Sequence, residues 1–222
     1  MTHLGILSLD TAFPRIPGDA GNPASYPFAA QVGVVAGAEA SRIVSDQPPP
    51  PALTAAFVAR AQRFEAEGAG ALVSTCGFLI HVQSEVAAAV RIPVMLSPLS
   101  LFPLVQRVRP GRVGILTASA AALGPRALAS AGIEEAEIAG LDHHAAFRET
   151  FLGPKSGQAQ PFSRNAMEVL VLQEARALAA RAPLSALIFE CGNLPPYADL
   201  VRAELGLPVF TILDAAAWMM AA

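Results

Sequence analysis

Apolar runs and amphipathic segments alternate along the whole chain. Near-continuous apolar runs, typical of parallel strands covered on both faces, occur at 4–9, 71–75, 112–117 and 186–190. Helical spacing of apolar positions, ended in several cases by glycine, predicts helices at 51–67, 78–90, 120–131, 163–181 and in a segment ending at 205. One more strand is expected at 134–139. The alternation predicts an α/β protein built on mainly parallel sheets.

The two halves of the chain repeat one pattern. Residues 71–79 read ALVSTCGFL and residues 186–194 read ALIFECGNL, so the two cysteines of the chain align at an offset of 115 residues. An Ile-Pro-Val run at 92–94 returns as Leu-Pro-Val at 207–209 with the same offset. We therefore expect two pseudo-symmetric lobes, residues 1–109 and residues 110–222, each a mainly parallel sheet flanked by helices, with the site in the inter-lobe cleft. The last helix could also cross onto the first lobe.

Three segments show neither the apolar runs of strands nor the apolar spacing of helices. Residues 10–27 are rich in proline and glycine and form a structured loop after the first strand, while four consecutive prolines at 48–51 form a stiff connector. A third loop is expected at 152–161. Long loops at the functional edge of a sheet act as lids or are plain surface excursions, and the sequence leaves both interpretations open.

Composition narrows the class of protein. The net charge of −3 provides no basic face for nucleic acid. The uncharged stretch 92–106 is too short to span a membrane and contains three prolines, and the N-terminus lacks the pattern of a secretory signal. A cytoplasmic protein with reduced thiols is expected.

The two cysteines carry the candidate chemistry. In parallel sheets the ligand site lies beyond the carboxyl ends of the strands, where Cys76 and Cys191 both fall. A helix start after each cysteine would lower the thiol pKa toward neutrality, and Gly77 and Gly192 would leave backbone N–H groups open to a carboxylate. One thiol on each wall of a cleft could remove a proton from a carbon acid while the other delivers one. No dinucleotide or phosphate-binding fingerprint is present, so no cofactor is expected.

These motifs, Thr-Cys-Gly-Phe-Leu around Cys76 and Glu-Cys-Gly-Asn-Leu-Pro-Pro-Tyr around Cys191, resemble the aspartate/glutamate racemase superfamily. That family also contains hydantoin racemases, maleate isomerases and arylmalonate decarboxylases. The resemblance covers the whole chain and implies a cofactor-independent and metal-free acid/base pair of cysteines between two lobes. Carried over by position, it makes Cys76 and Cys191 catalytic and assigns substrate binding to Asp10, Thr75, Gly77, Phe78, Thr117, Gly192 and Asn193.

The leading functional hypothesis is a racemase or epimerase of an amino acid or related carboxylate. Two alternatives remain open: a maleate-type cis–trans isomerase with a nucleophilic cysteine, and a non-catalytic protein that binds a small molecule. Retention of both cysteines disfavours an arylmalonate decarboxylase, because that member of the family has a single catalytic cysteine. The expected partners are a small carboxylate and, at most, further copies of this chain in a homo-oligomer.

Other polar residues give weaker signals. The run Asp142-His143-His144 fits an exposed polar turn better than a metal site, because adjacent residues seldom chelate together and no further ligand cluster is visible. His81 either tunes Cys76 or lies on a helix surface. Glu190 is expected to make a supporting hydrogen bond rather than act directly on a substrate.

Overall fold

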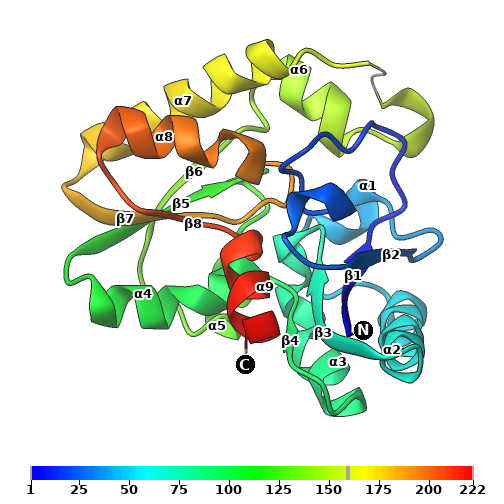
Figure 1. The fold of residues 1–222 in the computed structure, drawn as a ribbon. Helices are drawn as coiled ribbons and strands as arrows, with labels where there is room; N and C mark the ends of the chain where they lie inside the picture. Colours follow the sequence, from blue (N-terminus) through cyan, green and yellow to red (C-terminus); the bar gives the residue numbers. More distant parts are fainter. Residues whose placement is uncertain (1, 159–160, 222) are drawn as a thin grey trace.

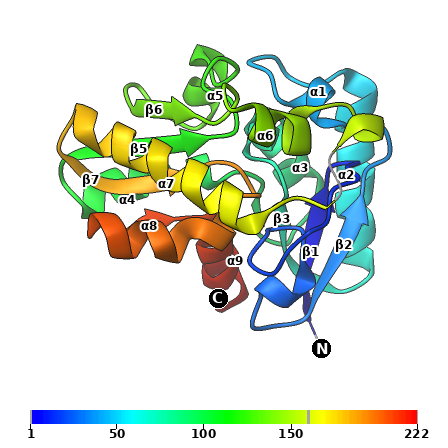
Figure 2. The same ribbon diagram turned by 90° about the horizontal axis from the view of Figure 1, so that it is seen from above.

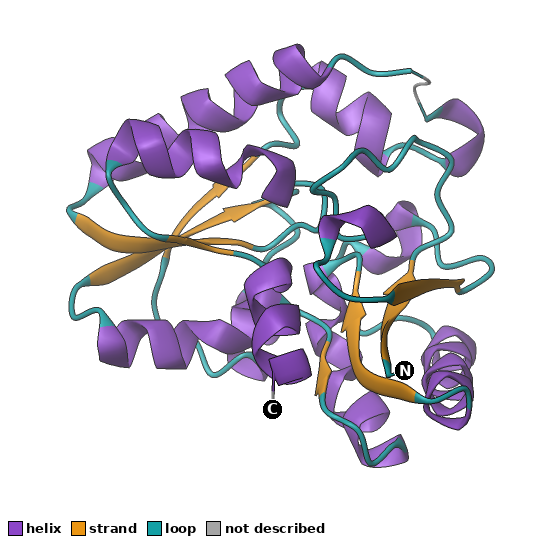
Figure 3. Cartoon of the chain, viewed as in Figure 1, coloured by secondary structure: helices purple, strands orange, loops and turns teal. Residues whose placement is uncertain are grey.

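Two parallel sheets of four strands each form the centre of the molecule, which is an α/β fold of two lobes, as predicted (Figures 1 and 3). The computed structural model describes residues 2–158 and 161–221. The first sheet has the order β2-β1-β3-β4, with bounds Ala30–Val34, His3–Ser8, Ala69–Ser74 and Val94–Met95. The second has the order β6-β5-β7-β8, with bounds Glu137–Gly140, Arg112–Thr117, Leu184–Phe189 and Val209–Phe210.

The sheets repeat each other down to their register. Leu7 pairs with Ser74 in the first sheet, and Leu116 pairs with Phe189 in the second. Each pairing carries one irregularity, after His3 in the first sheet and after Arg112 in the second. The sequence repeat therefore corresponds to a structural repeat, and the strands that lead to the two cysteines occupy the same station in both sheets.

Helices flank both sheets, and their ends follow from local sequence. The α-helices are α1 (Ala40–Ile43), α2 (Pro51–Ala66), α3 (Gln83–Ala89), α4 (Phe102–Val108), α5 (Pro125–Ser130), α6 (Ala145–Phe147), α7 (Arg164–Arg181), α8 (Ala198–Leu205) and α9 (Ile212–Ala221). Ser163 caps α7 by accepting the N–H of Ala166, and Gly206 ends α8 with a φ of 63°. Figure 1 shows α7 and α4 on opposite sides of the second sheet.

Several helices pack across the boundary between the sheets. Helix α9 lies against β3 and β4 of the first sheet, and α4 lies against β5 of the second (Figure 1). Asp46 of the first lobe accepts the N–H groups of Arg126 and Ala127, so it caps α5 of the second lobe. One buried cluster accordingly joins β1 and β3 with α5 and α9. This exchange of helices fixes the two sheets relative to each other.

The structure departs from the sequence prediction at some boundaries. The helix expected at 78–90 begins as a 3₁₀ helix, η2 (Gly77–Val82), before α3. Helix α5 starts at Pro125 rather than at 120, because proline is well suited to the first turn. Pro103 lies in the first turn of α4, as its second residue; this helix was not predicted from the sequence. No helix among the described residues is both long and apolar enough to cross a membrane.

Candidate active site

The two cysteines meet where the carboxyl ends of the sheets face each other. Cys76 follows β3, Cys191 follows β7, and their backbones pair in an isolated antiparallel bridge. Directly opposed residues in such a bridge direct their side chains to the same side. Both thiols are free, and each residue is less than a tenth exposed. The fold therefore places one thiol from each lobe at a single buried point.

The glycine after each cysteine permits this close crossing. A Cβ on Gly77 would lie 2.5 Å from the carbonyl oxygen of Glu190, and a Cβ on Gly192 would lie 2.5 Å from that of Thr75. Each glycine thus packs against the residue that precedes the opposite cysteine. This close backbone approach requires glycine at both positions. Carboxylate binding by their backbone N–H groups stays a prediction.

Thr75 and Glu190 occupy equivalent positions with different chemistry. Thr75 Oγ1 accepts the N–H of Leu9 at 3.0 Å, and Glu190 Oε2 accepts the N–H of Ala118 at 3.4 Å. Glu190 Oε2 also accepts the hydroxyl of Thr117 at 2.8 Å. Glu190 is completely buried, and its Oε1 has no hydrogen-bond partner. The second lobe therefore carries an ionisable group where the first carries a hydroxyl.

Burial governs the ionisation of all three groups. It raises the pKa of the Cys76 and Cys191 thiols well above the usual range, and the Glu190 charge raises both further. The N–H groups of Phe78 and Leu79 counteract this at Cys76, as that of Asn193 does at Cys191. Burial also raises the pKa of Glu190 to about 7. The expectation of thiol pKa values near neutrality is therefore wrong for this closed site.

A loop from the first lobe closes over Cys191. The Cys191 thiol donates to Asn193 Oδ1 at 3.4 Å, and Asn193 Nδ2 donates to Asp19 Oδ2 at 2.8 Å. Asp19 Oδ1 in turn accepts Arg15 Nη1 at 3.0 Å. The backbone N–H of Ala20 donates to the carbonyl of Gly192 at 2.9 Å. The 10–27 loop is thereby anchored on the second lobe.

A segment from the second lobe closes over the first in return. It comprises α6, the π-helix η4 (Arg148–Leu152) and the 3₁₀ helix η5 (Lys155–Gly157), and η4 lies beside α1 (Figure 2). Lys155 Nζ contacts Asp10 Oδ1 at 2.5 Å, and Gln158 Oε1 accepts the N–H of Ala12 at 2.7 Å. The rings of Phe13 and Phe151 meet edge to face at 4.9 Å. We call residues 145–158 the lid segment.

The loops enclose a small cavity beside the thiols. Its volume of about 20 Å³ has room for about one water molecule. A larger ligand can reach the thiols only when the lid segment or the 10–27 loop moves. The residues lining the cavity are Leu9, Thr11, Phe13, Arg15, Ala40, Val44, Thr75, Cys76, Phe78, Ala118, Phe151, Leu152, Glu190, Cys191 and Asn193.

Solved structures with the same architecture identify the fold. Allantoin racemase from Pseudomonas fluorescens matches with a TM-score of 0.63 and 11% identity, over 99% of this chain and 90% of its own. Aspartate racemase from Picrophilus torridus matches with a TM-score of 0.60 and 12% identity, over 100% and 94%. A mutant of arylmalonate decarboxylase has a TM-score of 0.60 and 15% identity, over 97% and 90%. The chain has the aspartate/glutamate racemase superfamily fold. No family model matches the sequence.

Proteins related to this chain in sequence are named for a different activity. A dimethylsulfoniopropionate lyase from Durusdinium sp. clade D is 27% identical over 220 residues, which cover 96% of this chain and 72% of the relative. Dimethylsulfoniopropionate lyases 5 and 7 from Emiliania huxleyi are 28% and 27% identical, over 95% and 99% of this chain. The chain spans only 44% and 66% of the length of those two relatives. The prediction of an isomerase, whether racemase or cis–trans isomerase, is therefore wrong, because these relatives are named as lyases.

The nine predicted site residues divide into two groups in this fold. Those that line the cavity are Thr75, Cys76, Phe78, Cys191 and Asn193. The other four predicted positions lie around it: Gly77 and Gly192 at the backbone crossing, Thr117 behind Glu190, and Asp10 beneath Lys155 of the lid segment. His81 bonds the carbonyl of Ser45 at 3.2 Å and does not line the cavity.

Sequence reasoning missed the residues that the two closing segments supply. Arg15 reaches the cavity from the 10–27 loop, and Phe151 and Leu152 reach it from the lid segment. The sequence repeat at 71–79 and 186–194 includes neither segment, so it offered no signal for them. The supporting hydrogen bond expected of Glu190 is confirmed, because its Oε2 accepts the Thr117 hydroxyl and the N–H of Ala118.

Proposed function

We propose that this protein is a lyase that eliminates dimethyl sulfide from dimethylsulfoniopropionate or a closely related β-sulfonium carboxylate. The observation that carries the proposal is the similarity to named dimethylsulfoniopropionate lyases over at least 95% of this chain. The paired thiols in a closed cavity supply groups suited to the chemistry.

The reaction requires removal of one proton next to a carboxylate. A base takes a proton from the carbon beside the carboxylate, and the C–H electron pair becomes the new carbon–carbon double bond. The bond to the sulfonium sulfur breaks, and its electron pair leaves with neutral dimethyl sulfide. The products are acrylate, dimethyl sulfide and the protonated base. Because the leaving group is neutral, the elimination needs a base but no acid.

Cys76 is the better placed of the two thiols to act as the base. Two backbone N–H groups, those of Phe78 and Leu79, stabilise its thiolate, whereas one, that of Asn193, supports Cys191. Cys191 already donates its proton to Asn193 Oδ1. In this proposal Cys76 takes the substrate proton as a thiolate, and Cys191 remains a thiol on the opposite wall.

The charged ends of the substrate would meet complementary groups in the cavity. Arg15 has five N–H donors in a planar fork that suits a carboxylate. The rings of Phe78 and Phe151 offer faces to a sulfonium cation, as aromatic side chains do for quaternary ammonium groups. The lid segment would exclude water once the substrate is bound.

Incubation of the purified protein with dimethylsulfoniopropionate tests the proposal. We expect dimethyl sulfide in the headspace and an equal amount of acrylate in solution. Cys76→Ser should lower kcat by at least about a hundredfold, the usual scale of a general base. Glu85→Gln, an exposed change on α3, should leave the rate unchanged. Absence of both products at millimolar substrate, from protein whose circular dichroism shows a folded chain, would contradict the proposal.

A further inference from the structure

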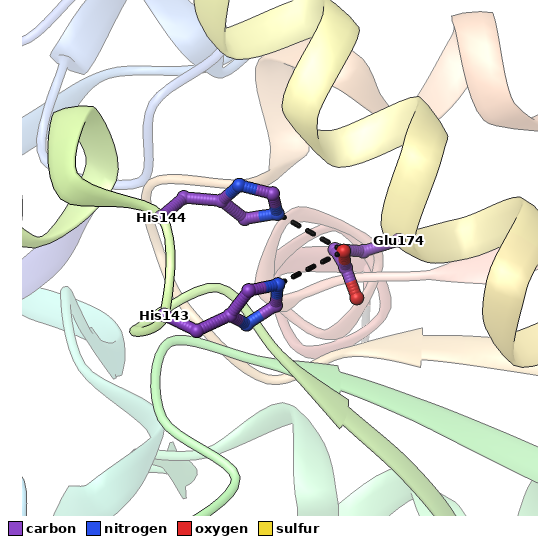
Figure 4. A group of neighbouring side chains, drawn as sticks. All are labelled: His143, His144 and Glu174. Carbon is purple, nitrogen blue, oxygen red and sulfur yellow. Dashed lines mark hydrogen bonds and ion pairs between the residues drawn. The ribbon is translucent and has the colours of Figure 1, made fainter.

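A second cluster of functional side chains lies outside the thiol cavity. The imidazoles of His143 and His144 lie side by side, with ring centroids 4.0 Å apart, and both face the Glu174 carboxylate (Figure 4). Nε2 of His143 is 3.2 Å from Glu174 Oε1, and Nε2 of His144 is 3.0 Å from the same oxygen. The prediction of an exposed polar turn is wrong for His144, whose side chain is only 15% exposed.

Glu174 occupies a position normally given to an apolar residue. It lies on the buried stripe of α7, with Met167, Val171 and Leu178 at three- and four-residue spacing, and it is 7% exposed. A buried carboxylate is costly unless a cation or strong donors compensate its charge. The two imidazoles provide two donors at most, and a divalent cation would compensate the charge more fully.

The spacing of the three ligand atoms fits a tetrahedral metal. Zinc binds imidazole nitrogen and carboxylate oxygen at about 2.0–2.1 Å, which places neighbouring ligand atoms about 3.3 Å apart. The two nitrogen–oxygen distances here are 3.0 and 3.2 Å, and all three ligand atoms lie within 4.8 Å of one another. A metal would therefore require only small movements of these side chains. Two nitrogens and one oxygen favour zinc over magnesium or calcium, which prefer oxygen ligands.

Backbone hydrogen bonds hold His144 in place for this role. The N–H of His144 donates to the carbonyl of Leu141 at 3.0 Å, and its carbonyl accepts the N–H of Arg148 at 3.0 Å. Asp142 is engaged elsewhere, because its carboxylate accepts the Ser119 hydroxyl and the N–H of Ala120. The ligand set is thus His143, His144 and Glu174, and no movement of the main chain is needed to assemble it.

We propose a zinc site, formed by His143, His144 and Glu174, that holds the start of the lid segment against α7. None of the three lines the thiol cavity, so the site is structural rather than part of the elimination. The side chain of His143 is 59% exposed, which gives the metal an entry path and leaves its fourth position to water. The lid segment begins directly after His144, so the metal would tie its first turn to α7.

Zinc titration of tag-free, metal-stripped protein tests the site. Isothermal titration calorimetry should show one equivalent bound with micromolar or tighter affinity, and zinc should raise Tm. Glu174→Gln and His143→Gln should each weaken binding by at least about tenfold, since changes even outside the ligand shell of zinc sites reach that size. His143→Gln changes an exposed side chain, so weaker zinc binding by this variant cannot be attributed to misfolding of the core. His81→Gln, which removes an imidazole of the first lobe, should leave the affinity unchanged.

Cobalt distinguishes this site from the cysteine pair, whose thiolates could also bind zinc. Co²⁺ bound by nitrogen and oxygen gives only weak visible bands, whereas thiolate ligation adds intense near-ultraviolet charge transfer. We expect the weak bands alone, and expect them to persist in Cys76→Ser/Cys191→Ser. Three results would each overturn the proposal: no zinc binding by the unmodified chain, affinity unchanged by His143→Gln and Glu174→Gln, or a thiolate spectrum that the cysteine substitutions abolish.

Discussion

Substitution of Glu190 by glutamine should change how stability depends on pH. Glu190 is fully buried, its Oε2 accepts Thr117 and Ala118, and its Oε1 has no partner. Burial raises the pKa of this carboxyl from 4.5 to about 7 in the folded protein. Glutamine keeps an oxygen that can accept the Thr117 hydroxyl and carries no charge. The substitution therefore removes the ionisation and leaves the packing nearly unchanged.

The size of the effect follows from the pKa difference. A shift of about 2.5 units at 1.36 kcal/mol per unit corresponds to about 3 kcal/mol. The folded protein holds the Glu190 proton to higher pH than the unfolded chain does. This contribution to stability is therefore complete below about pH 4.5, is lost as the pH rises to about 7, and changes no further above that.

Denaturant unfolding across this range measures the effect. The free energies of unfolding of the unmodified protein and Glu190→Gln should differ by a constant amount below about pH 4.5. Their difference should then shift by about 3 kcal/mol in favour of the variant by about pH 8. Glu85→Gln, with an exposed carboxyl, is the matched control and should follow the unmodified curve. A difference between Glu190→Gln and the unmodified protein that is constant from about pH 4.5 to 8 would refute the reasoning.

Three further outcomes are expected. Gly192→Ala forces a Cβ to within 2.5 Å of the Thr75 carbonyl oxygen and should lower the free energy of unfolding by about 1–3 kcal/mol, as overpacking does. In the control Gly157→Ala the new Cβ meets nothing closer than 3.8 Å, so denaturant unfolding should show no change. Lys155→Ala removes the exposed ion pair between Lys155 and Asp10 that holds the lid segment. Tm should stay within about a degree or two, while iodoacetamide should alkylate the two thiols faster. An unchanged alkylation rate would count against opening of the lid segment at this contact. Alkylation of Cys76 and Cys191 in the unmodified protein should keep accelerating above about pH 8.5, because burial raises both pKa values; a plateau at that pH would show ordinary thiols.

The repeat made most of the fold predictable. Strand β5 has the predicted bounds, and α7 and α8 end where their patterns stop, because caps and apolar runs are local signals. The strands β4 and β8 have two residues each, too few for any periodicity to be visible. Strand β2 was missed because its residues alternate weakly at the edge of its sheet. Elements of this kind are set by pairing with a neighbour rather than by their own sequence.

The candidate site was predictable only where the repeat reaches it. The positions of Cys76 and Cys191 follow from matched strands, which the sequence displays twice. Thiol ionisation did not follow, because the burial that raises both pKa values depends on Phe13, Phe151 and other residues of the closing segments. These segments reach the site across the boundary between lobes, and no local pattern encodes such a contact.

The unequal walls of the cavity fit an elimination better than an inversion. Inversion of a stereocentre calls on two groups of matched strength, because each must serve as base for one enantiomer. Here Cys76 has two backbone donors at its sulfur, while Cys191 has one and donates its own proton to Asn193. Glu190, the counterpart of Thr75, adds a second asymmetry by raising both thiol pKa values when it is charged. Its pKa of about 7 makes that charge depend on pH near neutrality. Because the Glu190 charge raises the pKa of the proposed base Cys76, Glu190→Gln should shift the rise of lyase activity to lower pH, in addition to stabilising the fold above about pH 7.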